Sequence, residues 1–510
     1  MAGDSLGKWS VVIVVCIAIF VIVLDTSAMN VAITTVVVEL HTDLSTMQAL
    51  IALYALIIAS FMLTGSKIQD VLGRKKTFLI GAAIYGVGTT TATLSLNVFM
   101  LLIGWSVLEG IGAAFMLPAT TTLISARYEG KDRLVAFGIW GGIAAMGSAI
   151  GPLYGGVLTS FTSWRFIFAF ELLGVFAIFA LMSALSESTP RLRWRDMDYV
   201  GIVLSIVSLV VLVLGILLLG SPPNWALVPV LVTVGVVIFA AFLLWQRRRA
   251  RHGVEPLLDV SLLRNRLYGL GTLVSSIQQV ALAGFLFILP VFLQQVTKFD
   301  AFTTGLALLP ASISVFVLSL AGSRLTPFMR PKHVVLIGFL VAAAGAFLLR
   351  DVFGLYTQIT DILPGSIVFG AGVGLLLSQL TNLTMSAAGK DQQTDASGFL
   401  NTAKNLGYSV GTALIGVILL VGIFNGLVSA VSTSTLVSNT TQQQVEANLL
   451  AYTETMQTRA PPSIPQSLIP EAQRIIDSTM SSAMHVTFIA LSLIMLLGFV
   501  IALLLPRSRP

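Results

Sequence analysis

The stretch GSKIQDVLGRKKTFLIG, residues 65–81, is echoed by GSRLTPFMRPKHVVLIG at residues 322–338. The two stretches share Gly, Ser, Lys, Leu, Ile and Gly at an offset of 257 residues. The tripeptide Gly-Lys-Asp at 130–132 recurs at 389–391, an offset of 259. Two matches at nearly one offset indicate an internal duplication, so we expect two related halves.

Long apolar runs lie on either side of these repeated segments. Hydrophobic residues make up 56% of the 510-residue chain and charged residues 10%, against about 25% charged in soluble domains. A bilayer span needs about 20 mostly apolar residues. Fourteen stretches qualify, with approximate limits 10–38, 46–66, 77–96, 98–122, 134–160, 164–185, 199–220, 225–246, 267–293, 302–323, 333–350, 362–386, 396–424 and 484–505. The sequence therefore predicts an all-α integral membrane protein.

The basic residues predict the orientation of these spans. With a cytoplasmic N-terminus, 23 Lys and Arg fall in inside loops and tails, five fall outside, and Lys404 lies within a span. This bias follows the positive-inside rule and predicts that both termini are cytoplasmic. The repeat offset corresponds to eight spans, an even number, so the halves should share one orientation, as in transporters built from parallel repeats.

These patterns predict three units. Residues 1–190 should form a six-helix bundle, 191–255 two linking helices, and 256–510 a second six-helix bundle with an extracellular loop at 425–483. The polar loop carries two stretches that could be short helices, 441–458 and 468–480. Cys16 is the one cysteine, so no disulfide can form within the chain.

Several function classes find no support. The four histidines are scattered, so no metal site is predicted. No Gly-x-Ser-x-Gly elbow or phosphate-binding loop is found, which disfavours hydrolysis and ATP-driven transport. The basic residues are spread over many loops rather than gathered into a nucleic-acid surface. A membrane enzyme or receptor is therefore the least supported alternative.

Four motifs carry a resemblance. They are LDTSAMNVAI at 24–33, DVLGRKK at 70–76, LEGIGAA at 108–114, and a glycine and proline pattern in the fifth span formed by Gly138, Gly147, Gly151, Pro152, Gly155 and Gly156. Together they resemble the major facilitator superfamily, in particular its fourteen-span drug/proton antiporter branch of multidrug efflux transporters. The chain departs from the branch at Thr34, usually Pro, at Ser106, usually Arg, and at Glu109, usually Gln.

The resemblance implies a major facilitator fold with 6+2+6 spans and a cavity lined by spans 1, 4, 9 and 12. It implies a monomer in the cell membrane that uses the proton gradient, with no cofactor, to export lipophilic or cationic amphipathic molecules. Export of one endogenous product, such as an antibiotic, lipid or siderophore, is the alternative. The sequence does not predict the range of substrates.

Buried charges are the candidates for proton coupling. A charge at the centre of a span costs roughly 2.5–3.5 kcal/mol on insertion scales, so such residues should face the interior or a cavity. Asp25, Glu109 and Glu171 are the acids within spans, and we assign them to proton coupling. For Glu171, pairing with Arg165 or exposure near the outer surface is the alternative.

Polar residues in the other spans are candidates for substrate contact, and two segments for gating. The substrate set comprises Asn30, Gln278, Gln279, Gln379, Asn382, Asn401 and Asn405, the last two of which could instead pack their span with Lys404. The gating set comprises Asp70, Gly73 and Arg74 in the loop and Gly147, Gly151 and Pro152 in the fifth span. Anchoring by the positive-inside rule and simple helix packing are the alternatives for these two segments.

Overall fold

The computed structural model describes residues 2–187, 190, 192–218, 226–325, 328–389, 392–432 and 469–506, and all regular structure within these ranges is helical. The first half comprises α1 (Ala2–Glu39), α2 (Leu44–Leu72), α3 (Arg74–Thr93), α4 (Val98–Leu101), the π-helix η1 (Leu102–Glu109), α5 (Gly110–Arg127), α6 (Gly130–Phe161) and α7 (Arg165–Ala180). Segments α4, η1 and α5 follow one another without a break and form one span.

Two linking helices and the second half follow. The 3-10 turns η2 (Met182–Ala184) and η3 (Trp194–Asp196) precede α8 (Tyr199–Leu217) and α9 (Val228–Arg251). The second half comprises α10 (Ser261–Arg264), α11 (Arg266–Gln295), α12 (Ala301–Arg324), α13 (Pro331–Leu349), α14 (Ile359–Met385), α15 (Gln393–Ser432) and α17 (Ile469–Leu503). Each predicted span corresponds to one of these helical segments, which confirms the all-α membrane fold.

Twelve helices in the described part of the chain are long and apolar enough to cross a bilayer. The two other predicted spans are α3, which starts with three basic residues, and α7, which has 16 residues. Both pack along their neighbours: α3 lies against α5 and α7, and α7 also lies against α1. They therefore belong to the same helix bundle.

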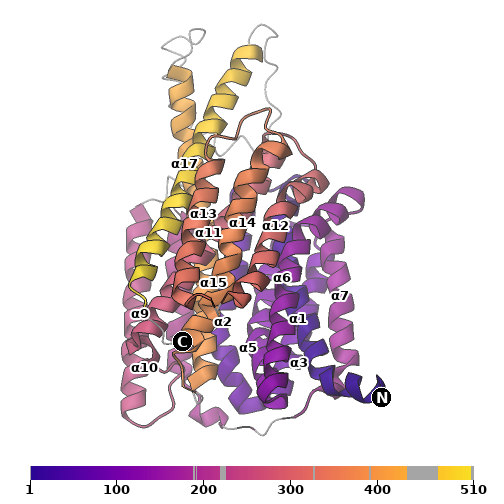
Figure 1. The fold of residues 1–510 in the computed structure, drawn as a ribbon, viewed down its shortest axis with the longest axis vertical. Helices are drawn as coiled ribbons and strands as arrows, with labels where there is room; N and C mark the ends of the chain where they lie inside the picture. The colour runs from indigo at the N-terminus through magenta and orange to yellow at the C-terminus, as the bar shows by residue number, and fades with distance from the viewer. Residues whose placement is uncertain are drawn as a thin grey trace.

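Figure 1 shows the helices running side by side along the long axis of the molecule. We call the end that carries the α2–α3 turn at Gly73 the inner end, and the end that carries Glu39 and Asp300 the outer end. Buried apolar side chains form two large clusters, one mainly from residues 11–185 and one mainly from residues 274–505. The fold thus has two cores, one in each half.

The duplication reappears in the helix contacts. A Cβ atom on Gly81 would meet the carbonyl oxygen of Gly112 at 2.9 Å, and one on Gly338 would meet that of Gly372 at 3.1 Å. The second pair lies 257 and 260 residues after the first. Glycines at these contacts let α3 approach α5, and α13 approach α14, to backbone distance. The repeat read from the loops is therefore built into the packing of both halves.

The linking helices are tied to each other by one buried acid. The carboxylate of Asp198 accepts hydrogen bonds from Trp245 at 2.9 Å and Gln246 at 2.7 Å, and Arg249 lies 3.6 Å away. Helix α8 packs on α9 and also contacts α2 and α15. The pair therefore lies against the seam between the halves.

The described helices reach into the stretch 425–483 that the sequence predicts as one loop. Helix α15 continues to Ser432, and α17 begins at Ile469 and projects from the outer end of the bundle (Figure 1). The predicted short helix at 468–480 is therefore the first part of α17 rather than a separate element. The predicted helix at 441–458 lies outside the described residues. Helices can continue into water past the apolar run because their backbone groups bond internally.

Candidate functional site

Three acidic side chains meet in the core of the first half. Asp25 on α1, Glu109 at the end of η1 and Glu171 on α7 are each at most 2% exposed. One carboxylate oxygen from each lies within 4.8 Å of one from each of the others. The three acids assigned to proton coupling thus form one cluster, which we call the acid triad.

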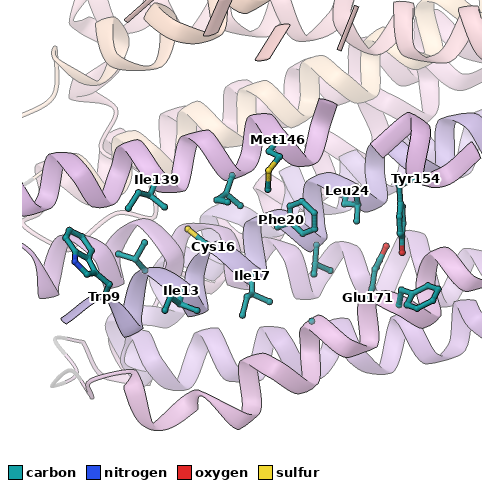
Figure 2. A pocket seen from close by; sticks show the side chains of 15 residues that line it. Trp9, Ile13, Cys16, Ile17, Phe20, Leu24, Ile139, Met146, Tyr154 and Glu171 are labelled. Carbon is teal, nitrogen blue, oxygen red and sulfur yellow. The ribbon is translucent and has the colours of Figure 1, made fainter. Parts of the chain in front are cut away.

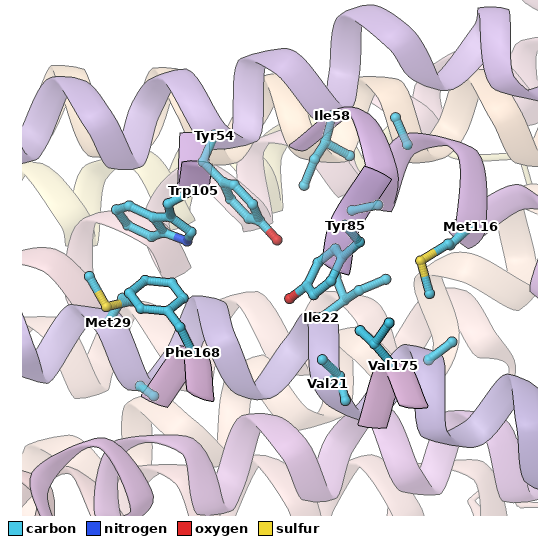
Figure 3. Packing of buried hydrophobic residues seen from close by; sticks show 14 of the residues in the cluster. Val21, Ile22, Met29, Tyr54, Ile58, Tyr85, Trp105, Met116, Phe168 and Val175 are labelled. Carbon is cyan, nitrogen blue, oxygen red and sulfur yellow. The ribbon is translucent and has the colours of Figure 1, made fainter. Parts of the chain in front are cut away.

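Aromatic side chains enclose the acid triad. The indole N–H of Trp105 donates to Asp25 Oδ2 at 2.9 Å, and the hydroxyl of Tyr85 donates to Glu171 Oε2 at 2.9 Å. Tyr54 stacks on Trp105 with ring centroids 5.6 Å apart. Figure 3 shows the hydroxyls of Tyr54 and Tyr85 and the indole nitrogen of Trp105 directed into the same interior space. The shell thus offers hydrogen-bond donors to two of the three carboxylates.

Other carboxylate oxygens in the triad are not satisfied. Within the described part of the chain, neither oxygen of Glu109 accepts a hydrogen bond, nor do Asp25 Oδ1 and Glu171 Oε1. At an effective dielectric constant of about 20, two negative charges 4.8 Å apart repel by roughly 3.5 kcal/mol. Such a site can hold protons between its oxygens or bind a small cation.

The local backbone explains how Glu109 reaches this position. Residues 102–109 form a π-helix inside an otherwise α-helical span, and such wide turns occur often at functional sites. A Cβ atom on Gly88 of α3 would meet the backbone nitrogen of Glu109 at 2.7 Å and the carbonyl oxygen of Gly104 at 2.6 Å. Since both contacts require Gly88, helix α3 is pressed directly against the turn that carries Glu109.

Glu171 does not pair with Arg165. Instead, Arg165 donates to Glu39 Oε2 at 2.7 Å, and Trp164 donates to the same oxygen at 2.8 Å. This cluster closes the outer end of α1 against α7. Glu171 therefore faces Asp25 and Glu109 rather than Arg165.

Polar side chains also cross between the halves. Asn30 donates to the hydroxyl of Tyr408 at 3.3 Å, which joins α1 to α15. Thr34, at the position where the resembled branch has Pro, donates to Gln294 on α11, and Gln294 donates to the carbonyl of Val31 at 2.7 Å. The contacts of Thr34 and Gln294 join α1 to α11, the first long helices of the two halves, at their outer parts, and Asn30 adds a contact from α1 to α15.

The other predicted substrate residues fall into three groups. Gln278 is buried, and its Nε2 has no hydrogen-bond partner among the described residues, as is true of Gln279 Oε1. Gln379 donates to the carbonyl of Gly322 at 2.8 Å, so it ties α14 to α12.

The third group lies at the inner parts of α14 and α15. Asn382 is exposed, and Asn401 and Asn405 are half-buried. Lys404 donates to Thr381 at 2.6 Å, which joins the two helices beside Asn382. These side chains form a polar surface distinct from the acid triad.

The fifth-span motif builds two seams on α6. Its glycines Gly147, Gly151 and Gly155 follow at intervals of four residues and face α1, where a Cβ atom on Gly155 would meet the carbonyl of Ala28 at 2.5 Å. On an adjacent face, a Cβ atom on Gly156 would meet the carbonyl of Ala301 on α12 at 2.5 Å. The motif therefore joins α6 both to its own half and to the other.

The same helix separates from its neighbours toward the inner end. A Cβ atom on Gly138, Gly141 or Gly142 would meet nothing within 4 Å, and residues 138–146 are half-buried or exposed. The inner part of α12 is likewise more exposed than its first turns. The halves are thus closed along α6 and α12 at the outer end and apart at the inner end.

On the opposite side, α2 and α15 stay in contact. Gln48 donates to the carbonyls of Thr412 at 2.9 Å and Ala413 at 3.0 Å near the outer end. At the inner end, Lys67 pairs with Asp395 of α15 at 3.3 Å and with Glu255, in the loop before α10, at 3.0 Å. We call these three residues the inner latch.

The predicted gating loop is a tight turn beside the inner latch. Gly73 has φ 90°, a backbone conformation that favours glycine. Arg74 donates to the carbonyl of Thr122 on α5 at 3.3 Å, and the Asp70 carbonyl accepts from Leu192 at 2.9 Å. The loop is thus packed against α5 and against the segment that leads to α8.

Sequence reasoning missed Lys67 and the aromatic shell of Tyr54, Tyr85 and Trp105. Lys67 is one of the 23 basic residues assigned to the inside, and the sequence does not indicate that its side chain is buried. Tyr54 and Tyr85 are not indicated by the sequence either, because every predicted span contains at least one aromatic side chain. Trp105 lies four residues before Glu109, a spacing that already places both side chains on one face of a helix, and this is the sequence signal that could have found Trp105.

Comparisons with known proteins agree with this architecture. A family model described as Major Facilitator Superfamily matches residues 15–198 and 180–412. The puromycin resistance protein pur8 of Streptomyces alboniger is 29% identical over 82% of this chain and 82% of its own length. The multidrug resistance protein Stp of Mycobacterium tuberculosis is 28% identical over 79% of this chain and 74% of its own length. A bacterial homologue of the human lysosomal transporter Spinster, solved in an inward-facing and unoccupied conformation, superposes with a TM-score of 0.62 at 14% identity over 99% of both chains.

Proposed function

Because this multi-pass membrane protein belongs to the major facilitator superfamily, we propose that it is a proton-coupled antiporter that exports lipophilic, cationic or similar amphipathic molecules. Relatives named for resistance to puromycin and to multiple drugs support export as the direction. The acid triad is the observation that carries the coupling. The protein would act as a monomer in the cell membrane with both termini, and hence the inner end, in the cytoplasm.

Protons would be held by the acid triad. Since ionising a second carboxylate costs roughly 3.5 kcal/mol in Coulomb energy at this spacing, the triad retains protons until a positive charge arrives or the site meets water. A cationic substrate would stabilise the ionised form, and proton release would follow. By linkage, the proton then disfavours substrate by the same factor, which is the thermodynamic basis of antiport.

Alternating access would come from the seams between the halves. The α6–α12 seam and the α1–α11 hydrogen bonds close the outer end, while the inner latch holds α2 against α15. Opening one set while closing the other would expose the polar residues between the halves to alternate sides. We propose that Asn30, Gln278, Gln279, Asn382, Asn401 and Asn405 contact substrate during this exchange. Gln379 of α14, bonded to the carbonyl of Gly322 on α12, would support them.

The loop and the fifth-span motif would act as gates. Asp70, Gly73 and Arg74 lie beside the inner latch, so movement of this turn would accompany its opening. Gly147, Gly151 and Pro152 keep α6 close to α1 and α12, so the helix would transmit movement between the halves. Both roles stay proposals that substitutions can test.

Dye efflux from proteoliposomes with an imposed pH gradient tests the function. A gradient of one pH unit is worth about 1.4 kcal/mol per proton, or about tenfold dye accumulation per proton exchanged. Wild-type protein should reach this level and lose it with an uncoupler. Asp25→Asn should abolish the gradient-driven accumulation, whereas Glu129→Gln, an exposed acid at the start of α6, should not.

Two results would overturn the proposal. Full gradient-driven efflux by Asp25→Asn would remove the acid triad from the coupling. Accumulation that follows an imposed sodium gradient and ignores the pH gradient would make the triad a metal-ion site instead.

A further inference from the structure

A long apolar groove runs along the first half between α6 and α7, with α1 as its floor (Figure 2). Its volume is about 620 Å³, within the range of roughly 300–1,000 Å³ that small-molecule sites occupy. Trp9, Ile13, Ile17, Phe20 and Leu24 line it from α1. Their spacings of three and four residues place them on one helix face. At 1.5 Å per residue this stripe is about 22 Å long, enough for an extended amphipathic molecule.

The mouth of the groove is apolar. Ile13 of α1, Ile139 of α6 and Phe170 of α7 line it and are 39%, 42% and 47% exposed. Nearby on α7, Leu173 and Phe176 are 60% and 67% exposed. In a membrane-spanning bundle such a surface faces lipid tails. The groove therefore opens sideways to the hydrocarbon layer, away from the contacts between the halves.

One carboxylate marks the far end of the groove from Trp9. Figure 2 shows Glu171 and Tyr154 together at that end. Glu171 lines the groove although it is only 2% exposed. Its Oε2 accepts from Tyr85, while Oε1 has no partner among the described residues. An unsatisfied carboxylate oxygen at the end of an apolar groove is complementary to a cation that carries an apolar body.

We propose that this groove is a lateral binding site for lipophilic cations, which it takes directly from the bilayer. The apolar body lies along the α1 stripe, and the cationic group contacts Glu171. The kind of ligand rests on the proposed function, because that function includes export of lipophilic cations. Binding to the groove can be measured independently of transport. The groove adds a site away from the contacts between the halves and leads its occupant to the acid triad.

Lipid is the competing occupant, and the charge separates the two. An acyl chain would fill the apolar stripe and offer nothing to Glu171 Oε1, and a neutral alcohol could donate a hydrogen bond there but would bring no positive charge. A quaternary ammonium with a long alkyl chain supplies both parts. The inner half of α6 has open space behind it at Gly138, Gly141 and Gly142, so it can move aside to admit such a molecule.

Binding of dodecyltrimethylammonium to the purified full-length protein in lipid nanodiscs tests the proposal, with dodecanol as the neutral probe. Ile17→Trp fills the groove from its floor on α1 and Ile143→Trp fills it from its wall on α6, and each should weaken binding of the cation at least about tenfold. Leu173→Trp makes a similar change on the lipid face of α7 and should leave binding unchanged. Glu171→Gln should weaken the cation about tenfold and dodecanol hardly at all.

The outcomes separate this site from the proposed function. Wild-type affinity in both groove-filling variants would overturn the site, and so would equal binding of the two probes with no effect of Glu171→Gln, which indicates a lipid groove. Gradient-driven dye efflux is measured on the same preparation. Efflux without groove binding would retire the lateral site alone, whereas groove binding without gradient-driven efflux would retire the antiport alone.

Discussion

Removing the charge of Lys67 should release the inner ends of the two halves. Its side chain is 7% exposed, while those of its partners Asp395 and Glu255 are 20% and 49% exposed. Exposed ion pairs contribute about 0–1 kcal/mol, and breaking a buried pair costs about 3–5 kcal/mol. The inner latch lies between these limits, so we expect Lys67→Gln to weaken it by about 1–3 kcal/mol. That corresponds to a change of about 5- to 150-fold in the ratio of the two access states.

Spin labels at Ala126 and Ser386 can report this ratio. Both residues are exposed at the inner end, one at the end of α5 and the other just after α14. The single native cysteine, Cys16, is replaced by Ala so that labels attach only at the chosen positions. Distance distributions from pulsed electron resonance should show the longer separation gaining population in Lys67→Gln.

Two controls make the reasoning refutable. Lys67→Arg keeps the charge and should stay near wild type, and Lys76→Gln removes an exposed charge at the same end and should have no effect. A distance distribution for Lys67→Gln identical to that of wild type would show that the latch does not hold the halves together. An equal shift in Lys76→Gln would attribute the effect to general charge rather than to this contact.

Two further predictions concern stability at the outer end. Gly156→Val places a side chain against the carbonyl of Ala301 and should destabilise the outer seam by about 1–3 kcal/mol, which thermal unfolding would show as a lower unfolding temperature. Gly138→Val, whose side chain meets open space, should leave the unfolding temperature unchanged. Equal decreases in the two variants would contradict the seam. Asp300 caps α12, and the hydrogen bond from Thr303 lowers the pKa of its carboxyl group. Its stabilisation is thus present at neutral pH and lost as the pH falls through that lowered pKa. Asp300→Ala should cost about 1 kcal/mol at pH 7 and nothing at low pH, and a constant difference across the titration would contradict this assignment.

The sequence predicts the helices and the burial of the acids well, for one physical reason. Lipid penalises charge and unpaired backbone, so long apolar runs must be helices and Asp25, Glu109 and Glu171 must turn inward. The sequence does not predict how far each helix is rotated about its axis or how deep each side chain lies in the bilayer. The meeting of the three acids depends on how α1, η1 and α7 are turned about their axes, and the π-helix adds to that rotation without any signature in the residues.

Contacts between distant segments were harder to foresee. Lys67 meets Asp395 and Glu255 only because α2 lies against α15. The composition of the two spans does not predict that they are neighbours. The alternative offered for Glu171, a pair with Arg165, was wrong because Glu39 at the end of α1 is nearer to that arginine. The duplication was visible in two loops, whereas its glycine contacts required the positions of helices in both halves.

The π-helix at 102–109 makes the position of Glu109 adjustable. A wide turn accommodates one residue more than an α turn, and one residue corresponds to about 100° of rotation around a helix of 3.6 residues per turn. If the turn tightened, Glu109 would swing about the axis relative to Asp25 while the span stayed continuous. A change of one residue in the hydrogen-bonding register of this turn would thus move one carboxyl group, and the rest of the bundle need not bend.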